Sequence, residues 1–213
     1  KWKCFVLGSR LELKDSCPGK AKKLVNHYLQ TQNEKQKYHL LIESSKIAEF
    51  QGEIPKTIMY FENTRDYMRS EWKAYLEYIH MLIRNHQFEQ ALEVAKESLY
   101  YHNLAGRLWA SMIQLQHILG HASSGTDAYK AFMIAVNEVP KSGEVWCEGA
   151  RVCLNPLSDR FNIEKAKRFL NFAIYFTPQY GDSFIEAMRL YLLLDDRKEY
   201  TNLKKKIINA QPN

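Results

Sequence analysis

Apolar residues recur along this chain at helical spacing, in blocks separated by short polar breaks. In WKAYLEYIHMLI (72–83) the apolar positions fall three or four residues apart, which places them on one face of a helix. The polar stretch RNHQ (84–87) interrupts the pattern, and FEQALEVAKESLYYH (88–102) then repeats it. The pattern therefore predicts two amphipathic helices joined by a short turn.

The same two-helix pattern returns nearer the C-terminus. VWCEGARVCL (145–154) and IEKAKRFLNFAIYF (163–176) carry it on either side of the loop NPLSDRFN (155–162). A weaker copy ends in EYTNLKKKIINA (199–210), and the final QPN (211–213) resembles the start of the earlier linkers. We expect the native protein to continue with another repeat.

Large aromatic residues mark the start of each predicted helix pair. Three tryptophans lie 37 residues apart, and steps of 34 to 38 residues in either direction reach a further aromatic residue each time. A small residue follows the first five of these ring markers by 19 or 20 residues, which predicts a close approach of two helices. The ring markers are Trp2, Tyr38, Trp72, Trp109, Trp146 and Phe184, and the small residues are Ala21, Thr57, Ala91, Ala128 and Ala166.

Glycine and proline punctuate the predicted linkers. Gly106, Gly143 and Gly181 each lie three residues before a ring marker, and Pro140 and Pro178 each lie six residues before one. We interpret each proline as the end of the preceding helix. We interpret each glycine as a residue in a left-handed turn, where a Cβ would be penalised.

Helix pairs with this period predict an all-α protein, because each pair can bury its apolar face only against its neighbours. The expected fold is a right-handed α-solenoid of about six antiparallel helix pairs. We expect one helical-repeat domain over 1–213, with repeats at about 1–36, 37–70, 71–106, 107–143, 144–181 and 182–213.

The opening tryptophan and the step of about 19 residues to a small residue resemble HAT (half-a-TPR) repeats. The match covers all six repeats and is best in EWKAYLEYIHMLIRNHQFEQALEVAKESL (71–99). The resemblance implies a scaffold in an RNA-processing assembly for splicing, 3′-end processing or ribosome biogenesis, and hence a nuclear or nucleolar location rather than a cytoplasmic one. It also implies a homodimer as a further hypothesis.

Composition and motifs argue against an enzyme or a membrane protein. The chain is 46% apolar with only 9 glycines and 6 prolines, and no apolar run approaches the length needed to cross a bilayer. No phosphate loop, nucleophile elbow or zinc-protease motif occurs, so we expect no catalytic residues and no cofactor. His117 and His121 are taken as surface residues and not as metal ligands. We expect reduced, mostly buried thiols at Cys4, Cys17, Cys147 and Cys153.

Positive charge is concentrated in the first predicted repeat. Residues 1–37 hold nine basic and three acidic side chains, a net charge of +6, so residues 38–213 are neutral overall. Lys20, Lys22 and Lys23 are the candidates for contact with RNA phosphates or an acidic protein tail. A purely structural role as a polar cap is the third interpretation.

The function that fits best is protein binding, with a peptide or helix held on a concave surface formed mainly by second helices. Two alternatives remain open: a cytoplasmic or cytoskeletal TPR-type adaptor, and a direct RNA-binding module. Arg151, Arg168 and Arg189 are expected to be solvated or paired with nearby glutamates.

Overall fold

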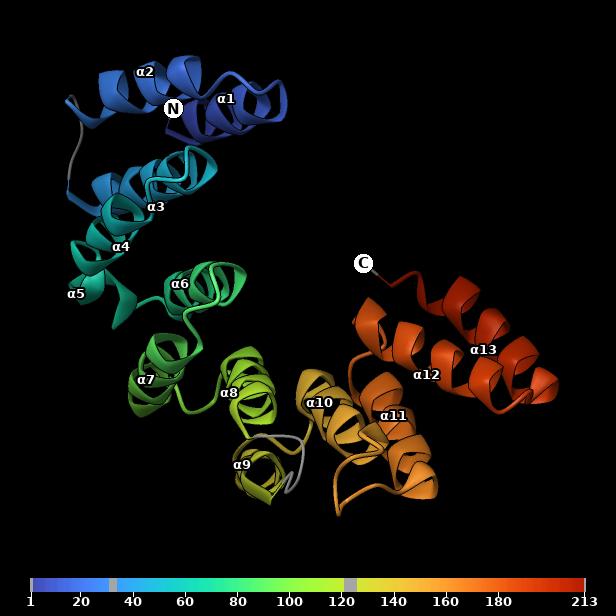
Figure 1. Cartoon of the computed structure of the whole chain (residues 1–213). Helices are drawn as coiled ribbons and strands as arrows, with labels where there is room; N and C mark the ends of the chain where they lie inside the picture. The colour runs from blue at the N-terminus through green and yellow to red at the C-terminus, as the bar shows by residue number, and fades with distance from the viewer. Residues whose placement is uncertain (1, 31–33, 121–125, 213) are drawn as a thin grey trace. The chain divides into compact units, whose positions relative to one another are not determined.

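The computed structural model describes residues 2–30, 34–120 and 126–212. Within these ranges every regular element is a helix and no strand is present, which confirms the expected all-α class. The helices gather into two compact units, Lys1–Asn85 (unit 1) and His86–Asn213 (unit 2), whose helices are labelled in Figure 1. A single repeat domain over 1–213 stays a prediction.

Unit 1 begins with two helix pairs. Its helices are α1 (Trp2–Lys14), α2 (Pro18–Leu29), α3 (Glu34–Phe50), α4 (Ile54–Glu62), α5 (Arg65–Met68) and α6 (Trp72–Arg84). Helix α1 packs against α2, α3 packs against α4, and the two pairs meet where α1 and α2 contact α3 (Figure 1). Glu49 of α3 accepts hydrogen bonds from Arg84 of α6 at 2.9 and 2.8 Å. These bonds link α6 to α3.

Unit 2 continues the same alternation. Its helices are α7 (Phe88–Tyr101), α8 (Gly106–Leu119), α9 (Thr126–Glu138), α10 (Gly143–Leu154), α11 (Ile163–Phe176), α12 (Gly181–Leu193) and α13 (Arg197–Ala210). Helices α8, α10 and α12 contact one another in order, and each also contacts the second helix of its own pair (Figure 1). Such a row of stacked pairs is the arrangement of an α-solenoid.

Helix starts in unit 2 are capped by side chains at the ends of the linkers. The side chains of Ser142, Asn162 and Asp196 accept hydrogen bonds from backbone N–H groups in the first turns of α10, α11 and α13. These residues have short polar side chains that reach the otherwise unpaired N–H groups. The caps explain why the helices begin close to where the apolar pattern begins.

Three of the turns inside the helix pairs each place one residue in the left-handed region. Ser16, Gly52 and Asp195 have φ of 56°, 75° and 50°, and each lies two residues before the second helix of its pair. These turns are three residues long, at 15–17, 51–53 and 194–196. The reversal of the chain therefore occurs here, between first and second helix.

The linker glycines have a different role from the predicted one. Gly106, Gly143 and Gly181 are the first residues of α8, α10 and α12, and among the described glycines only Gly52 has a positive φ. The interpretation as left-handed turns is therefore wrong. A Cβ on Gly143 would lie 2.6 Å from the carbonyl oxygen of Ala173, so the glycine is required by close approach of two backbones.

The tryptophan ring markers of unit 2 form hydrogen bonds to the linkers and also pack against the core. The indole N–H of Trp109 donates to the carbonyl of Asn103 and that of Trp146 to the carbonyl of Pro140, both at 2.7 Å and both six residues back. The two indoles are half-buried against the core of unit 2, whereas the Phe184 ring is 2% exposed. Each indole thus fastens the linker that leads into its own helix.

The small residues that follow the ring markers lie at helix contacts. Ala21, Thr57, Ala91, Ala128 and Ala166 stand on α2, α4, α7, α9 and α11 and are at most 1% exposed. Larger side chains at these positions would hold the helices of a pair apart. The hydroxyl of Thr57 donates to the backbone carbonyl of Glu53 at 3.1 Å, so its polar atom is satisfied inside the contact.

Candidate partner-binding surface

A groove of about 450 Å³ lies in unit 1 among the first helices α1, α3 and α6. Tyr67 of α5 and Glu71, the residue that caps α6, complete its wall. Helices α2 and α4 supply none of its lining residues in the described part of unit 1. The sequence predicted a binding face mainly on second helices, whereas this groove is lined by first helices, and the predicted binding face stays a prediction.

Small side chains on the second helices help to explain why the groove lies among the first helices. The second helices use Ala21 and Thr57 to pack inward, so their close contacts are already made within the pair. Arg10, Glu43 and Lys46 of the first helices lie away from these contacts and line the groove. The groove of unit 1 is therefore a surface of first helices.

A row of charged side chains joins the three first helices along the groove. Glu43 of α3 is buried at 3% exposure and accepts two hydrogen bonds from Nε of Arg10 on α1, at 3.2 and 3.1 Å. Nη2 of Arg10 donates to the same carboxylate. The Lys46 amine lies 3.6 Å from Glu43 and 3.3 Å from Glu77 on α6. The buried carboxylate is thus neutralised from both sides.

Stacked rings form one end of the groove. The ring of Trp2 on α1 stacks on His39 of α3, with centroids 4.4 Å apart and planes 3° apart. Nε2 of His39 lies 3.3 Å from the hydroxyl of Tyr67, which also lines the groove. Burial lowers the pKa of His39 below its usual value, so the imidazole is neutral at neutral pH. This end of the groove is therefore a cluster of aromatic rings.

The groups that the groove leaves available are an apolar side chain and two amines. Leu7 of α1 is 59% exposed, and Lys3 and Lys73 are exposed residues of the groove wall. The Lys3 amine lies 5.8 Å from the centroid of the Trp2 ring. Such a surface complements a protein segment that carries an apolar residue flanked by carboxylates.

The three candidate lysines of α2 do not form one site. Lys20 and Lys23 are exposed, and the Lys20 amine lies 3.9 Å from Glu12. Lys22 is half-buried and lines a small cavity together with Glu53 and Lys56 of the neighbouring pair. Two of the three therefore remain available to a partner, while the third is enclosed between helix pairs.

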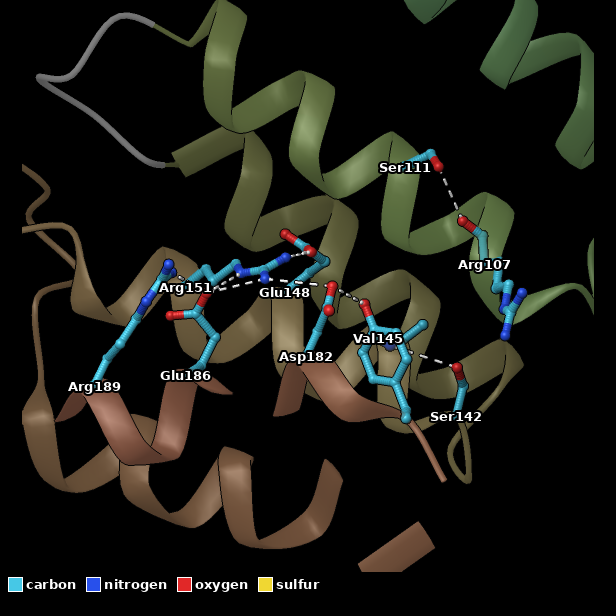
Figure 2. Close-up of polar contacts among 10 residues, drawn as sticks. Arg107, Ser111, Ser142, Val145, Glu148, Arg151, Asp182, Glu186 and Arg189 are labelled. Atoms are coloured by element: carbon cyan, nitrogen blue, oxygen red, sulfur yellow. Dashed lines mark hydrogen bonds and ion pairs between the residues drawn. The ribbon is translucent and has the colours of Figure 1, made fainter. Parts of the chain in front are cut away.

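In unit 2 the first helices carry a network centred on one arginine. Arg151 of α10 donates to Glu148 on its own helix, and to Glu186 of α12 at 3.1 and 3.0 Å. Asp182 lies 3.7 Å from the same guanidinium, and Arg189 bonds to Glu186 at 3.1 Å (Figure 2). The expectation that Arg151 and Arg189 pair with glutamates is confirmed.

This network confines three carboxylates around the Arg151 guanidinium. Burial raises the pKa of Glu148 to about 6, although the charge of Arg151 acts in the opposite direction. Glu186 and Asp182 add to the increase because like charges disfavour ionisation. Helices α10 and α12 of unit 2 therefore pair their charged side chains with one another.

The candidate histidines and cysteines do not form a metal site among the described residues. Burial lowers the pKa of His117, whose Nε2 lies 3.0 Å from the side-chain nitrogen of Asn155, and His121 lies outside the described residues. No group of three metal-ligating side chains occurs in the part of the chain that was described. Cys147 and Cys153 are buried free thiols as expected, but Cys4 is exposed. No described helix is long and apolar enough to cross a membrane.

The family model described as PRP6, TPR-like domain matches residues 1–213, the whole chain. The chain belongs to the PRP6 TPR-like domain family. A TPR-containing protein of Dictyostelium discoideum is 46% identical over 146 residues, which are 68% of this chain and 11% of that protein. The chain thus matches only about a tenth of the length of this curated relative.

Solved structures of other proteins share the fold. A tetratricopeptide repeat protein of Parabacteroides merdae is 13% identical with a TM-score of 0.61, covering 98% of this chain and 79% of its own. PilF of Pseudomonas aeruginosa is 12% identical with a TM-score of 0.59, covering 97% and 90%. These identities support the fold alone. The sequence-based resemblance to TPR-like repeats is confirmed, and the chain is a TPR-like repeat scaffold.

Within this PRP6 TPR-like fold, sequence reasoning missed the groove residues Arg10, Glu43 and Lys46. A signal was present, because Glu43 and Glu77 each lie five residues after their ring markers. Equal charge at an equal repeat position indicates a shared face, here the wall of the groove. Arg168, considered together with Arg151 and Arg189, is exposed on α11.

Proposed function

We propose that this chain is a non-catalytic protein-binding scaffold of an RNA-processing assembly, and of a splicing assembly first of all. The groove of unit 1 carries the proposal, because it offers Leu7, Lys3 and Lys73 beside an aromatic end wall. Membership of the PRP6 family supports splicing and a nuclear location over the other assemblies. A partner helix or extended segment would lie across α1, α3 and α6.

The test is affinity purification of the full-length protein from nuclei, followed by mass spectrometry. The groove variant Leu7→Glu/Lys73→Glu alters two exposed positions that line the groove. The matched control Leu11→Glu/Lys14→Glu makes the same chemical changes at exposed positions outside the groove. We expect splicing proteins with the unaltered protein and with the control, and their loss with the groove variant.

Two results would contradict the proposal in different ways. Recovery of cytoskeletal proteins or chaperones in place of splicing proteins would favour the cytoplasmic TPR-type adaptor. Recovery of splicing proteins in equal amounts with both variants would leave the assembly in place and remove the groove as its binding site. A homodimer, proposed from the HAT resemblance, is tested separately by light scattering of the purified chain.

A further inference from the structure

The loop between α10 and α11 differs from the other turns of its kind. It spans 155–162, eight residues, where the pairs α1–α2, α3–α4 and α12–α13 use three. A longer connection that is held in place often carries a binding function. This loop lies in unit 2, on different elements from the groove described above.

Hydrogen bonds fix the shape of this loop from inside. Ser158 is buried at 6% exposure, and its hydroxyl and carbonyl accept from the N–H groups of Arg160 at 3.1 Å and Phe161 at 2.9 Å. The Asn162 N–H donates to the carbonyl of Cys153 at 2.9 Å, which closes the loop onto the end of α10. The side chains that this loop exposes are therefore held in defined positions.

The fixed loop presents apolar side chains to solvent. Leu157 is 67% exposed and Phe161 is 46% exposed. Neither side chain is buried in the core, whereas the side chain of Ser158 between them is buried. Exposed apolar residues on a rigid loop are a feature of binding surfaces.

Two cations flank these apolar residues and converge on one ring. The Arg160 guanidinium lies 5.1 Å and the Lys165 amine 4.9 Å from the ring centroid of Tyr129 on α9, and the amine is 2.7 Å from the Tyr129 hydroxyl. Both cations are exposed, and neither forms an ion pair within the described ranges. Two exposed positive charges at one ring are complementary to an acidic partner.

We propose that this loop patch, formed by Leu157, Arg160, Phe161, Lys165 and Tyr129, binds an acidic segment of a partner protein in which carboxylates alternate with leucine or aromatic residues. Arg160 and Lys165 bind the carboxylates, and Leu157 and Phe161 contact the apolar side chains. RNA fits less well, because the two cations already cover the Tyr129 ring and leave only Phe161 as a stacking surface. The proposal is independent of the splicing assignment.

The experiment measures fluorescence anisotropy of a dye-labelled peptide of about twelve residues, in which Asp and Glu alternate with Leu and Phe. The intact chain is compared with Arg160→Glu/Lys165→Glu and with the matched control Lys141→Glu/Lys205→Glu. The control makes the same change in net charge at exposed lysines of unit 2 outside the patch. We expect the patch variant to bind at least about tenfold more weakly and the control to bind within about twofold of the unaltered chain.

The apolar half of the patch has its own test. Leu157→Ser/Phe161→Ser keeps the charge and is expected to weaken peptide binding by about tenfold, with Phe161→Ser alone as the second variant if circular dichroism shows lost helix. Equal weakening by patch and control variants would overturn the proposal, because general charge would then explain the binding. Stronger binding of an oligouridylate of the same length would overturn it in favour of RNA.

Discussion

Glycine at the start of a first helix is the residue on which the packing of unit 2 depends most visibly. The N–H of Gly143 donates to Oγ1 of Thr177 at 2.9 Å, and the Ala173 carbonyl occupies the space where a Cβ would stand. The start of α10 therefore rests directly on the end of α11. One added methyl group at Gly143 is enough to disturb this contact.

Gly143→Ala is expected to lower the free energy of unfolding by about 2 kcal/mol, because the new Cβ overlaps backbone that cannot turn aside. Urea denaturation followed by circular dichroism measures the change. Gly19→Ala is the matched control, since a Cβ there meets nothing within 4 Å on α2. An equal effect at both glycines would mean that helix propensity and not close approach decides the stability.

The indole N–H of Trp109 has a testable role of its own. Trp109→Phe keeps most of the ring but removes the donor to the Asn103 carbonyl, so we expect a loss of about 1 kcal/mol in unfolding free energy. Thermal unfolding of the purified variant gives the measurement. A variant as stable as the unaltered chain would show that the hydrogen bond to the linker contributes nothing.

Residue spacing predicted where these side chains stand but not always why. A glycine three residues before a ring marker fits a left-handed turn and a close backbone contact equally well, because both require the absence of a Cβ. Only the position of Ala173, 30 residues further along the chain, distinguishes them. That information is long-range, and a local pattern does not contain it.

At the scale of elements, the three-residue turns determine how the chain reverses direction between the two helices of a pair. Gly52 has a φ of 75° and no atom within 4 Å of an added Cβ, so its conformation alone resists substitution. We predict that Gly52→Ala costs about 1 kcal/mol and that Ser16→Gly, at φ 56°, gains about 0.5 kcal/mol. Denaturation midpoints of the two variants test the pair. A change in the same direction for both would contradict this explanation.

The charged network between α10 and α12 makes stability depend on pH. The folded-state pKa of Glu148 is raised from 4.5 to about 6, so its contribution is fully present below about pH 4.5 and is lost as the pH rises through about 6. Glu148→Gln cannot ionise. Between pH 4.5 and neutral pH, we expect the free energy of unfolding of this variant to fall by about 2 kcal/mol less than that of the unaltered chain. Urea titrations at the two pH values measure this, and parallel losses would contradict it.

Helices were predictable because their signal is periodic and local. The pattern placed helices at 145–154 and 163–176, and the structure has Gly143–Leu154 and Ile163–Phe176. The proposed binding face was not predictable in the same way. It depends on which side of a pair remains uncovered after packing, and that is decided by contacts between helices distant in sequence.

At the scale of the whole molecule, the basic first repeat leaves direct RNA binding as a rival to protein binding. Lys20 and Lys23 are exposed but Lys22 is half-buried in a small cavity, which reduces the patch available to phosphates. We predict that an oligouridylate binds the chain weakly at low salt and not at physiological salt, with a loss in Lys20→Glu/Lys22→Glu/Lys23→Glu. Filter binding over a salt series measures this. Tight binding at physiological salt would favour the RNA-binding module.

The central claim is that the first-helix groove of unit 1 receives a protein partner. It is tested most directly by placing a photo-crosslinking amino acid at Leu7, in the groove, and in a second sample at Leu11, outside it. The full-length protein is then irradiated in cells, and its crosslinked products are identified by mass spectrometry. The account predicts a splicing protein joined at Leu7 and absent at Leu11. The same products from both positions, or none from Leu7, would contradict it.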